Sequence, residues 1–118
     1  MTDPNYGIVL VTVASQTEGE AIAYQLLEAK LAACVNLFPV TSIYVWQEKI
    51  EREREYQLTI KTDLNLFAEL SQKIKTLHSY EVPEIVAIPI AMGSNSYLQW
   101  LGSSLKPESD RESSHHSE

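Results

Sequence analysis

Residues 34–62, CVNLFPVTSIYVWQEKIEREREYQLTIKT, decide the fold that this sequence predicts. Residues 34–46 form an extended, aromatic run, and residues 56–62 alternate apolar with polar side chains as a strand does. Residues 47–55 alternate in charge, and we expect them to form a solvated hairpin tip between the two strands. Proline 39 lies inside the first strand and indicates a bulge or an edge position in the sheet.

A strand and a helix precede this hairpin. GIVLVTVAS (7–15) is a β-branched apolar run, which is typical of a buried central strand. Ser15 and Glu18 then match a capping box, so we expect a helix to begin here and to run to Ala33. Its predicted buried face consists of Ile22, Leu26, Ala29 and Ala33.

A second helix and strand follow the hairpin. Asp63 can cap a helix whose apolar stripe is Phe67, Leu70, Ile74 and Leu77. EIVAIPI (84–90) reads as a fourth strand, and residues 95–105 read as a short final helix. The complete order predicts an α+β fold, a ferredoxin-like βαββαβ sandwich with an extended hairpin between the second and third strands and a short C-terminal helix.

Length and composition limit the domain organisation and the setting. A chain of 118 residues suits one domain, which we place at residues 1–105. Residues 106–118, KPESDRESSHHSE, have no periodic apolar residues and are predicted to be a disordered tail. The single cysteine, Cys34, suits a reducing compartment. Because we find neither a signal peptide nor a membrane-length apolar run, we expect a cytoplasmic protein without membrane contact.

Charge and motifs exclude several classes of function. The net charge of −7 and the dispersed basic residues argue against nucleic-acid binding. The common sequence signatures of nucleophilic, zinc-dependent and phosphate-binding enzymes are absent from the sequence. We therefore expect the protein not to be an enzyme.

The apolar strands also predict an assembly. Residues 8–14 and 85–90 are apolar on both sides, whereas the two main helices of this fold cover only one face of the sheet. A large exposed apolar face is rare in soluble monomers, so we expect a partner chain to cover it. The long hairpin at residues 41–61 either embraces a neighbouring copy or folds back on its own sheet.

His78 is the candidate metal ligand, and Glu81 and Glu84 follow it at three-residue steps. Imidazole with oxygen donors suits an open copper or nickel site, completed by water or a neighbouring chain. The alternative is structural, with His78 at the end of the second helix and its ring hydrogen-bonded locally. His115 and His116 in the tail would bind such ions adventitiously.

Tyrosine and tryptophan side chains mark a second candidate site. Their rings favour places that are apolar at one end and hydrogen-bonded at the other, such as interfaces and pocket walls, although core packing is the alternative. The aromatic residues concerned are Tyr44, Trp46, Tyr80, Tyr97 and Trp100.

Six elements of the sequence together resemble the CutA family of divalent-cation-tolerance proteins, from about residue 8 to residue 105. They are LAAC, the S-x-Y-x-W of residues 42–46, Glu55, the Lys61–Thr62 pair, the H-x-Y-x-x-P-E of residues 78–84 and the Y-x-x-W of residues 97–100. The resemblance implies a ferredoxin-like domain in a homotrimer, similar in architecture to the PII signalling trimers. It also implies a role in tolerance of copper and other divalent ions, with no established catalytic reaction.

The resemblance implies two sets of site residues. Family members with assigned copper ligation use a first-strand cysteine and two adjacent histidines, positions that hold Val11, Leu77 and His78 here, and Ser79 replaces the usual proline. An intersubunit cleft would be formed by Tyr44, Trp46, Glu55, Lys61, Tyr80 and Trp100, together with His78 and Glu84. We therefore expect a trimer with no obligatory cofactor that binds copper(II) or another divalent cation weakly through His78 and Glu84. The alternative is a PII-like signalling or scaffold trimer that binds a small molecule or a protein in this cleft.

Overall fold

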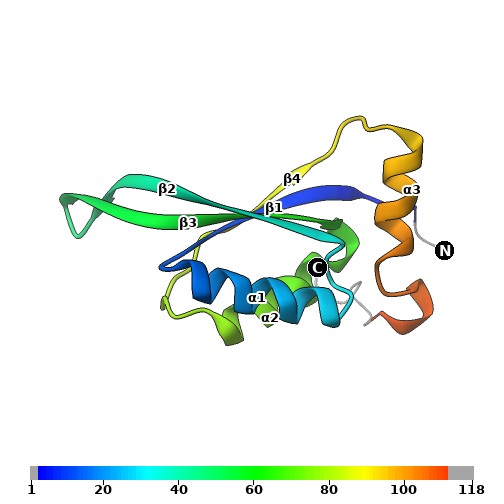
Figure 1. Cartoon of the computed structure of the whole chain (residues 1–118), viewed down its shortest axis with the longest axis horizontal. Coiled ribbons are helices and arrows are strands. Elements are labelled where there is room, and N and C mark those ends of the chain that lie inside the picture. The colour runs from blue at the N-terminus through cyan, green and yellow to red at the C-terminus, as the bar shows by residue number, and fades with distance from the viewer. Residues whose placement is uncertain (1–2, 112–118) are drawn as a thin grey trace.

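A computed structural model of the chain describes residues 3–111 and contains the predicted order of elements (Figure 1). These are β1 (Tyr6–Val13), α1 (Gln16–Glu28), β2 (Cys34–Trp46), β3 (Lys49–Asp63), α2 (Phe67–Leu77), β4 (Ile85–Pro89) and α3 (Asn95–Ser103), with 3-10 turns at Leu64–Leu66 and Glu108–Asp110. The strands form one antiparallel sheet in the order β2-β3-β1-β4. The predicted α+β, split βαβ arrangement is therefore confirmed.

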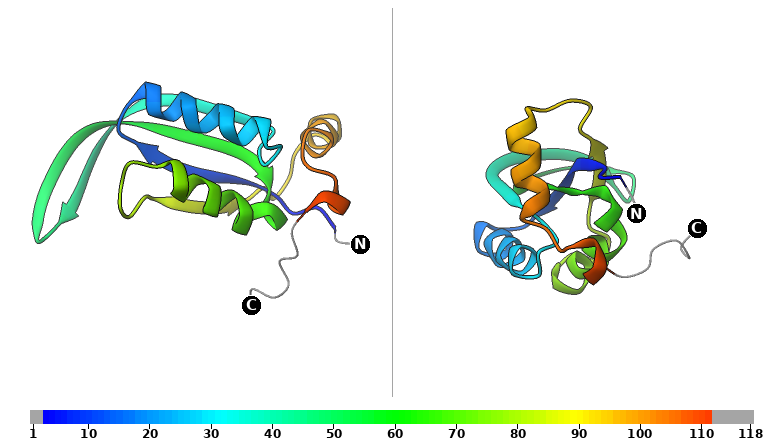
Figure 2. Two further views of the ribbon diagram at one scale, coloured as in Figure 1. Left: turned by 90° about the horizontal axis from the view of Figure 1, so that it is seen from below. Right: turned by 90° about the vertical axis from the view of Figure 1, so that its right-hand side faces the viewer.

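Helices α1 and α2 lie side by side on one face of the sheet (Figure 2). Alternation along β1 directs every second side chain toward these helices, where they are fully buried. The residues that fill this layer are Val9, Val11, Val13, Ile22, Leu26, Leu58, Ile60, Leu70 and Ile74. The predicted apolar stripes of both helices therefore contribute to one core.

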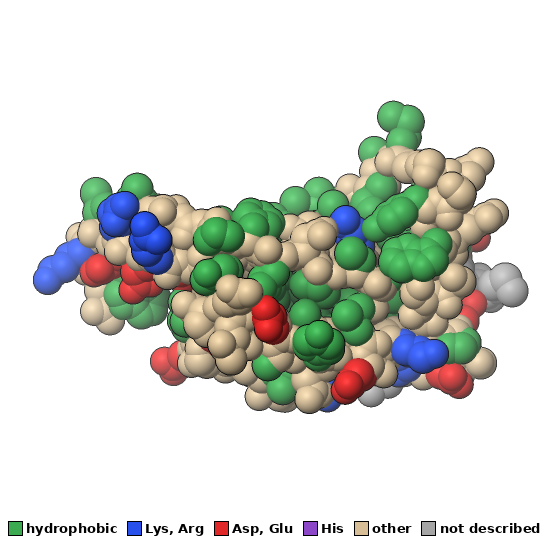
Figure 3. Space-filling view, viewed as in Figure 1, with side chains coloured by type: hydrophobic (Ala, Val, Ile, Leu, Met, Phe, Trp, Pro, Cys, Tyr) green, Lys and Arg blue, Asp and Glu red, His purple; other side chains and the backbone are tan. Residues whose placement is uncertain are grey.

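The opposite face of the sheet is not covered by either main helix. Val86 and Ile88 in β4 are about half exposed on this face, beside the partly buried Ile8 and Leu10 of β1. Helix α3 lies beyond the end of the sheet, and hydrophobic side chains reach the surface near it (Figure 3). Within residues 3–111 the structure thus shows the uncovered apolar face that the two-sided strands predict.

Helix α1 ends earlier than predicted. Lys30 takes a left-handed conformation with φ of 59°, and its N–H donates to the carbonyl of Leu27. The N–H of Leu31 donates to the carbonyl of Leu26, and both leucines are buried, as in a Schellman C-cap. The apolar pattern to Ala33 predicted a longer helix because glycine, the usual residue at this left-handed position, is absent.

The hairpin tip is much shorter than the predicted residues 47–55. Gln47 and Glu48 alone form the turn, both with positive φ as a type I′ turn requires, and β3 begins at Lys49. The charged residues of the predicted tip therefore pair with β2 along a ribbon that projects beyond the helices (Figure 2). Pro39 pairs in register with Tyr56 in the edge strand β2, a position in a sheet where proline is tolerated.

The packed chain continues beyond the predicted boundary at residue 105. The N–H of Lys106 donates to the carbonyl of Lys30, and the Arg111 guanidinium lies 3.0 Å from the Asp63 carboxylate. Residues 106–111 therefore differ from the predicted disordered tail, because polar backbone and ion-pair contacts hold them without an apolar pattern. His115 and His116 lie outside the described residues. None of the helices within residues 3–111 has the length and apolarity needed to cross a bilayer.

Candidate functional site

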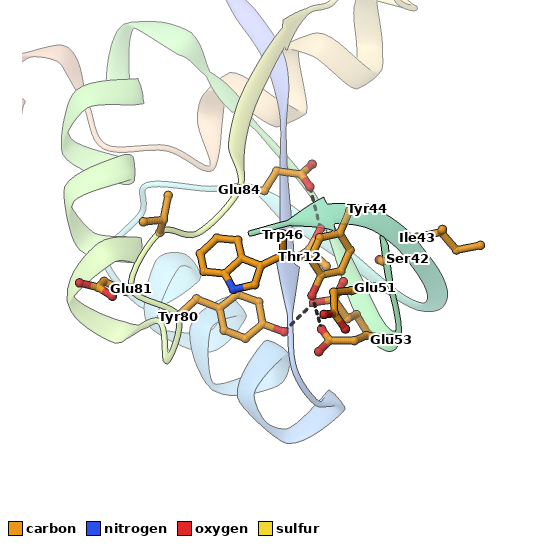
Figure 4. Close-up of a pocket in the computed structure, with 12 residues that line it drawn as sticks. Thr12, Ser42, Ile43, Tyr44, Trp46, Glu51, Glu53, Tyr80, Glu81 and Glu84 are labelled. Atoms are coloured by element: carbon orange, nitrogen blue, oxygen red, sulfur yellow. Dashed lines mark hydrogen bonds between the residues drawn. The ribbon is translucent and has the colours of Figure 1, made fainter. Parts of the chain in front are cut away.

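A pocket of about 840 Å³ opens between the projecting hairpin and the loop that joins α2 to β4 (Figure 4). Five of its lining residues are glutamates, and none of them is a lysine or an arginine. The lining consists of Thr12, Ser42, Ile43, Tyr44, Trp46, Glu51, Glu53, Glu55, Tyr80, Glu81, Val82 and Glu84. A pocket wall that carries only negative charges attracts cations.

Strand alternation builds the hairpin side of the pocket. Side chains two residues apart share a face, so Glu51, Glu53 and Glu55 point to the same side of β3. Tyr44 stands opposite Glu51 in the β2–β3 register and therefore lies on that face too. The arginines between these glutamates fall on the other face of the ribbon.

His78 fixes the other side of the pocket from behind. Its side chain is fully buried, and its Nε2–H donates to the carbonyl of Thr12 at 2.7 Å. The Nδ1 atom accepts from the N–H of Tyr80 at 3.0 Å, which leaves the proton on Nε2. Both ring nitrogens are therefore engaged in holding the 78–84 loop against β1, the role of the structural alternative for this residue.

Glu18, from the capping box, holds the same loop. Its carboxylate accepts from the N–H of Ser79 at 2.8 Å and from the Ser79 hydroxyl at 3.0 Å. Burial by itself raises the pKa of the Glu18 carboxyl, but the hydrogen bonds from Ser79 and Ala14 outweigh burial and leave the pKa lowered. Helix α1 thus fixes, through one side chain, the start of the loop that carries Tyr80 and Glu84.

Two tyrosines hydrogen-bond to the glutamates of the hairpin. The Tyr80 hydroxyl donates to Glu55 Oε2 at 2.5 Å, and the Tyr44 hydroxyl donates to Glu53 Oε1 at 2.8 Å (Figure 4). The hydrogen bond to Glu53 raises the pKa of Tyr44 to about 12. Burial, together with the bond to Glu55, raises the pKa of Tyr80. Both phenols therefore keep their protons at neutral pH and present uncharged aromatic walls.

The predicted site residues do not all meet. Tyr44, Trp46, Glu55, Tyr80 and Glu84 line the pocket. Glu84 accepts from the Thr12 hydroxyl at 3.1 Å, whereas His78 lies behind the loop.

Lys61 and Trp100 belong to another cluster around Tyr97. The Lys61 Nζ atom lies 5.9 Å from the centre of the Tyr97 ring, and the Tyr97 and Trp100 rings are 5.5 Å apart. Neither Lys61 nor Trp100 lines the pocket, so within one protomer the predicted cleft set divides in two.

Sequence reasoning missed Glu51 and Glu53 as pocket residues. The alternating charges of IEREREY predict a solvated tip if the segment is a loop, whereas in a strand the same alternation places all three glutamates on one face. The signal was present in the sequence, but its use required knowing that residues 49–55 are a strand.

A preassembled metal site is not found among residues 3–111, where no three His, Cys, Asp or Glu side chains are grouped closely enough to hold an ion. The His78 ring would have to give up the Tyr80 N–H or the Thr12 carbonyl to bind a metal. The described side chains therefore do not fit a tightly bound ion as they stand.

Comparison with known proteins identifies the family of this pocket-bearing domain. The sequence model described as "CutA1 divalent ion tolerance protein" matches residues 7–104. The chain belongs to the CutA1 family. It is 48% identical over 95 residues to the divalent-cation tolerance protein CutA of Thermus thermophilus. The matched region covers 80% of this chain and 92% of that protein.

CutA relatives of different origin share this similarity. The chloroplastic CutA of Arabidopsis thaliana is 40% identical over 100 residues, covering 84% of this chain and 55% of that protein. The solved structure described as the periplasmic divalent cation tolerance protein CutA from Archaeoglobus fulgidus superposes with a TM-score of 0.84 at 42% identity, covering 86% of this chain and 99% of that one. The resemblance inferred from the sequence is therefore confirmed, and the fold matches an experimental CutA structure.

Proposed function

We propose that this CutA1 chain acts in the tolerance of divalent cations by binding them weakly and reversibly at the acidic pocket, without catalysis. The observation that carries the proposal is the lining of that pocket, which holds five glutamates and no basic side chain. Copper(II) is the first ion to test, because imidazole and carboxylate oxygens are suitable ligands for it. The ion is an occasional ligand of this chain and not an obligatory cofactor.

Glu84 and His78 are the proposed ligands. Glu84 is exposed in the pocket and accepts a hydrogen bond from the neutral Thr12 hydroxyl, so its carboxylate is available to a cation. His78 becomes a ligand only after its ring releases one of two backbone partners, which makes binding weak. A closed site of high affinity would instead have three or four free ligands in place.

We also propose a homotrimer, supported by the uncovered sheet face and by the exposed apolar side chains of the hairpin. Three apolar side chains project from the ribbon with about two-thirds or more of their surface exposed, which is costly for a soluble monomer. They are Ile43, Val45 and Ile50. Light scattering during gel filtration should give the mass of three chains of 13.3 kDa each. A mass of one chain would contradict the trimer.

The second candidate is a PII-like signalling or scaffold trimer that binds a small molecule or protein in an intersubunit cleft. Its supporting observation is the aromatic wall of the pocket, which a bare ion does not need. We place either activity in the cytoplasm, because a single free cysteine suits a reducing compartment.

Calorimetric titration with copper(II) tests the proposed function. The full-length chain should carry His115→Ala and His116→Ala, because those imidazoles bind copper adventitiously. Saturable heat is expected, and Glu84→Gln should weaken binding about tenfold, as loss of a supporting ligand group commonly does. Glu28→Gln, at an exposed carboxylate on α1 far from the lining residues, is the matched control. Heat no greater than dilution, or equal affinity in both variants, would overturn the proposal.

A further inference from the structure

Residues 106–111, which we call the C-terminal strap, cross the end of the domain opposite the projecting hairpin (Figure 2). The strap follows α3 and begins directly after Leu105, a buried residue of the hydrophobic core. The N–H of Lys106 donates to the carbonyl of Lys30 at 2.9 Å, just beyond the end of α1. Arg111 folds the strap back on itself, because its Nε–H donates to the carbonyl of Lys106 at 3.0 Å.

Asp63 holds the far end of the strap with one of its two carboxylate oxygens. Its Oδ2 accepts from the Arg111 guanidinium at 3.0 Å, and the Asp63 side chain is 5% exposed. Its Oδ1 accepts from the N–H groups of Asn5 and Asn65, at 3.1 and 2.9 Å. Because the two oxygens bind different segments, the strap can leave while the N-terminal segment and the turn before α2 stay in place.

The second ion pair of the strap leaves one buried oxygen unsatisfied. Lys106 Nζ donates to Glu69 Oε2 at 2.8 Å, and both side chains are about one-fifth exposed. Glu69 Oε1 is buried and accepts no hydrogen bond from any residue within 3–111. A buried acceptor without a donor is destabilising. The closed strap therefore carries a local cost, which water removes when it replaces Lys106 at this carboxylate.

The strap packs loosely against the rest of the domain. Residues 107–110 are all exposed, and a cavity of about 370 Å³ separates the strap from α3 and the N-terminal segment. Tyr6, Gln99 and Ser103 line the domain side of this cavity, and Lys106, Pro107 and Arg111 line the strap side. Segments that are held by few buried apolar contacts open locally at a lower free energy than the core.

We infer that the C-terminal strap is a conformational device, held closed by the ion pairs of Lys106 and Arg111, that opens over this cavity while the rest of the domain remains folded. Opening breaks both ion pairs and the bond to the Lys30 carbonyl, and it exposes the carboxylates of Asp63 and Glu69 to water. The inference goes beyond the proposed function. The acidic pocket is lined by other residues of the described chain, so the strap does not depend on cation binding there.

Hydrogen exchange of the full-length protein, followed by NMR at single amides, tests the inference. The Lys106 amide reports on the strap, because its acceptor is the Lys30 carbonyl. It should exchange at least about a hundredfold faster than the slowest amides of the central strand β1, and its rate should not change with low concentrations of urea, as expected of local opening. Raising the salt from about 0.05 M to about 0.5 M should speed it about threefold, since salt screens the ion pairs.

Matched variants assign the closing force. Arg111→Gln removes the charge that pairs with Asp63 and should speed exchange of the Lys106 amide about tenfold, with the β1 amides unchanged. The Asn65 amide should stay protected in this variant, because its acceptor is the other oxygen of Asp63. Lys75→Gln removes an exposed positive charge at the end of α2 and is the control, which should leave the Lys106 amide unchanged.

Three results would overturn the inference. The first is a Lys106 amide that exchanges at the rate of the β1 amides and with the same dependence on urea, because the strap would then open only when the whole domain unfolds. The second is an equal effect of Arg111→Gln and Lys75→Gln, and the third is a rate that salt does not change. The measurements of urea and salt dependence use the unaltered chain, so they decide the question even where Arg111→Gln fails to fold.

Discussion

Replacement of His78 by alanine should destabilise the fold strongly, because its ring is a structural element before it is a metal ligand. The ring is fully buried and satisfies two backbone groups, the carbonyl of Thr12 at 2.7 Å and the N–H of Tyr80 at 3.0 Å. A buried polar group left without a partner costs about 1–3 kcal/mol, so the two together cost about 2–5 kcal/mol after partial access of water.

Graded variants make this prediction specific. His78→Asn can still accept from the Tyr80 N–H through its side-chain oxygen but cannot reach Thr12, so it should lose about half as much stability as His78→Ala. Ser79→Ala removes one exposed hydroxyl contact to Glu18 and should cost less than about 1 kcal/mol. Hydrogen exchange at the Tyr80 amide should speed up in the alanine variant, since that N–H loses its acceptor.

Urea unfolding at one fixed protein concentration measures these differences, because the stability of an oligomer depends on concentration. The three variants and the parent should be compared without added metal. A loss for His78→Ala as small as that for Ser79→Ala would refute the structural role and would leave the ring free to serve as a ligand.

Three further predictions concern pH and backbone geometry. The pKa of Glu18 is lowered from its ordinary 4.5. The ionised carboxylate therefore adds to the free energy of unfolding above pH 4.5, and this stabilisation is lost as the pH falls through the folded-state pKa. Glu18→Gln should flatten the dependence of the unfolding free energy on pH in this acidic window. Lys30→Gly should stabilise the chain by about 1 kcal/mol because Lys30 has φ of 59°, and a urea midpoint that falls would contradict this. Gln47→Asn combined with Glu48→Gly should raise the melting temperature, because both residues have positive φ in the two-residue turn; the reversed pair Gly-Asn is the control.

Local pattern predicted most of the fold. The N-cap at Ser15 forms as expected, with the Glu18 N–H donating to Ser15 Oγ at 3.1 Å, but the Glu18 carboxylate accepts from the N–H of Ala14 and not from that of Ser15. Proline 39 indicated a bulge or an edge position, and β2 is an edge strand; the two-sided apolar strands correctly indicated a face left uncovered by helices. These features depend on side chains a few residues apart or on the period of a strand, which the sequence displays directly.

Boundaries that depend on unusual backbone conformations were predicted less well. Lys30 and the pair Gln47–Glu48 adopt positive φ without glycine, so the sequence carries no sign that α1 stops or that the turn is so short. Burial of Leu31 against Leu26 and the pairing of β2 with β3 stabilise these conformations from outside the local segment.

The sequence by itself determined the order of elements, the core faces of the helices and the membership in the CutA1 family, because each rests on residue types at short or fixed spacing. Tertiary structure alone decided how the candidate residues are grouped. Only the folded sheet places Glu51 and Glu55 opposite the 78–84 loop, separates Lys61 from them, and engages both nitrogens of His78 with backbone from β1 and the loop. Hydrogen bonds between segments more than sixty residues apart specify that grouping, and no local pattern records them.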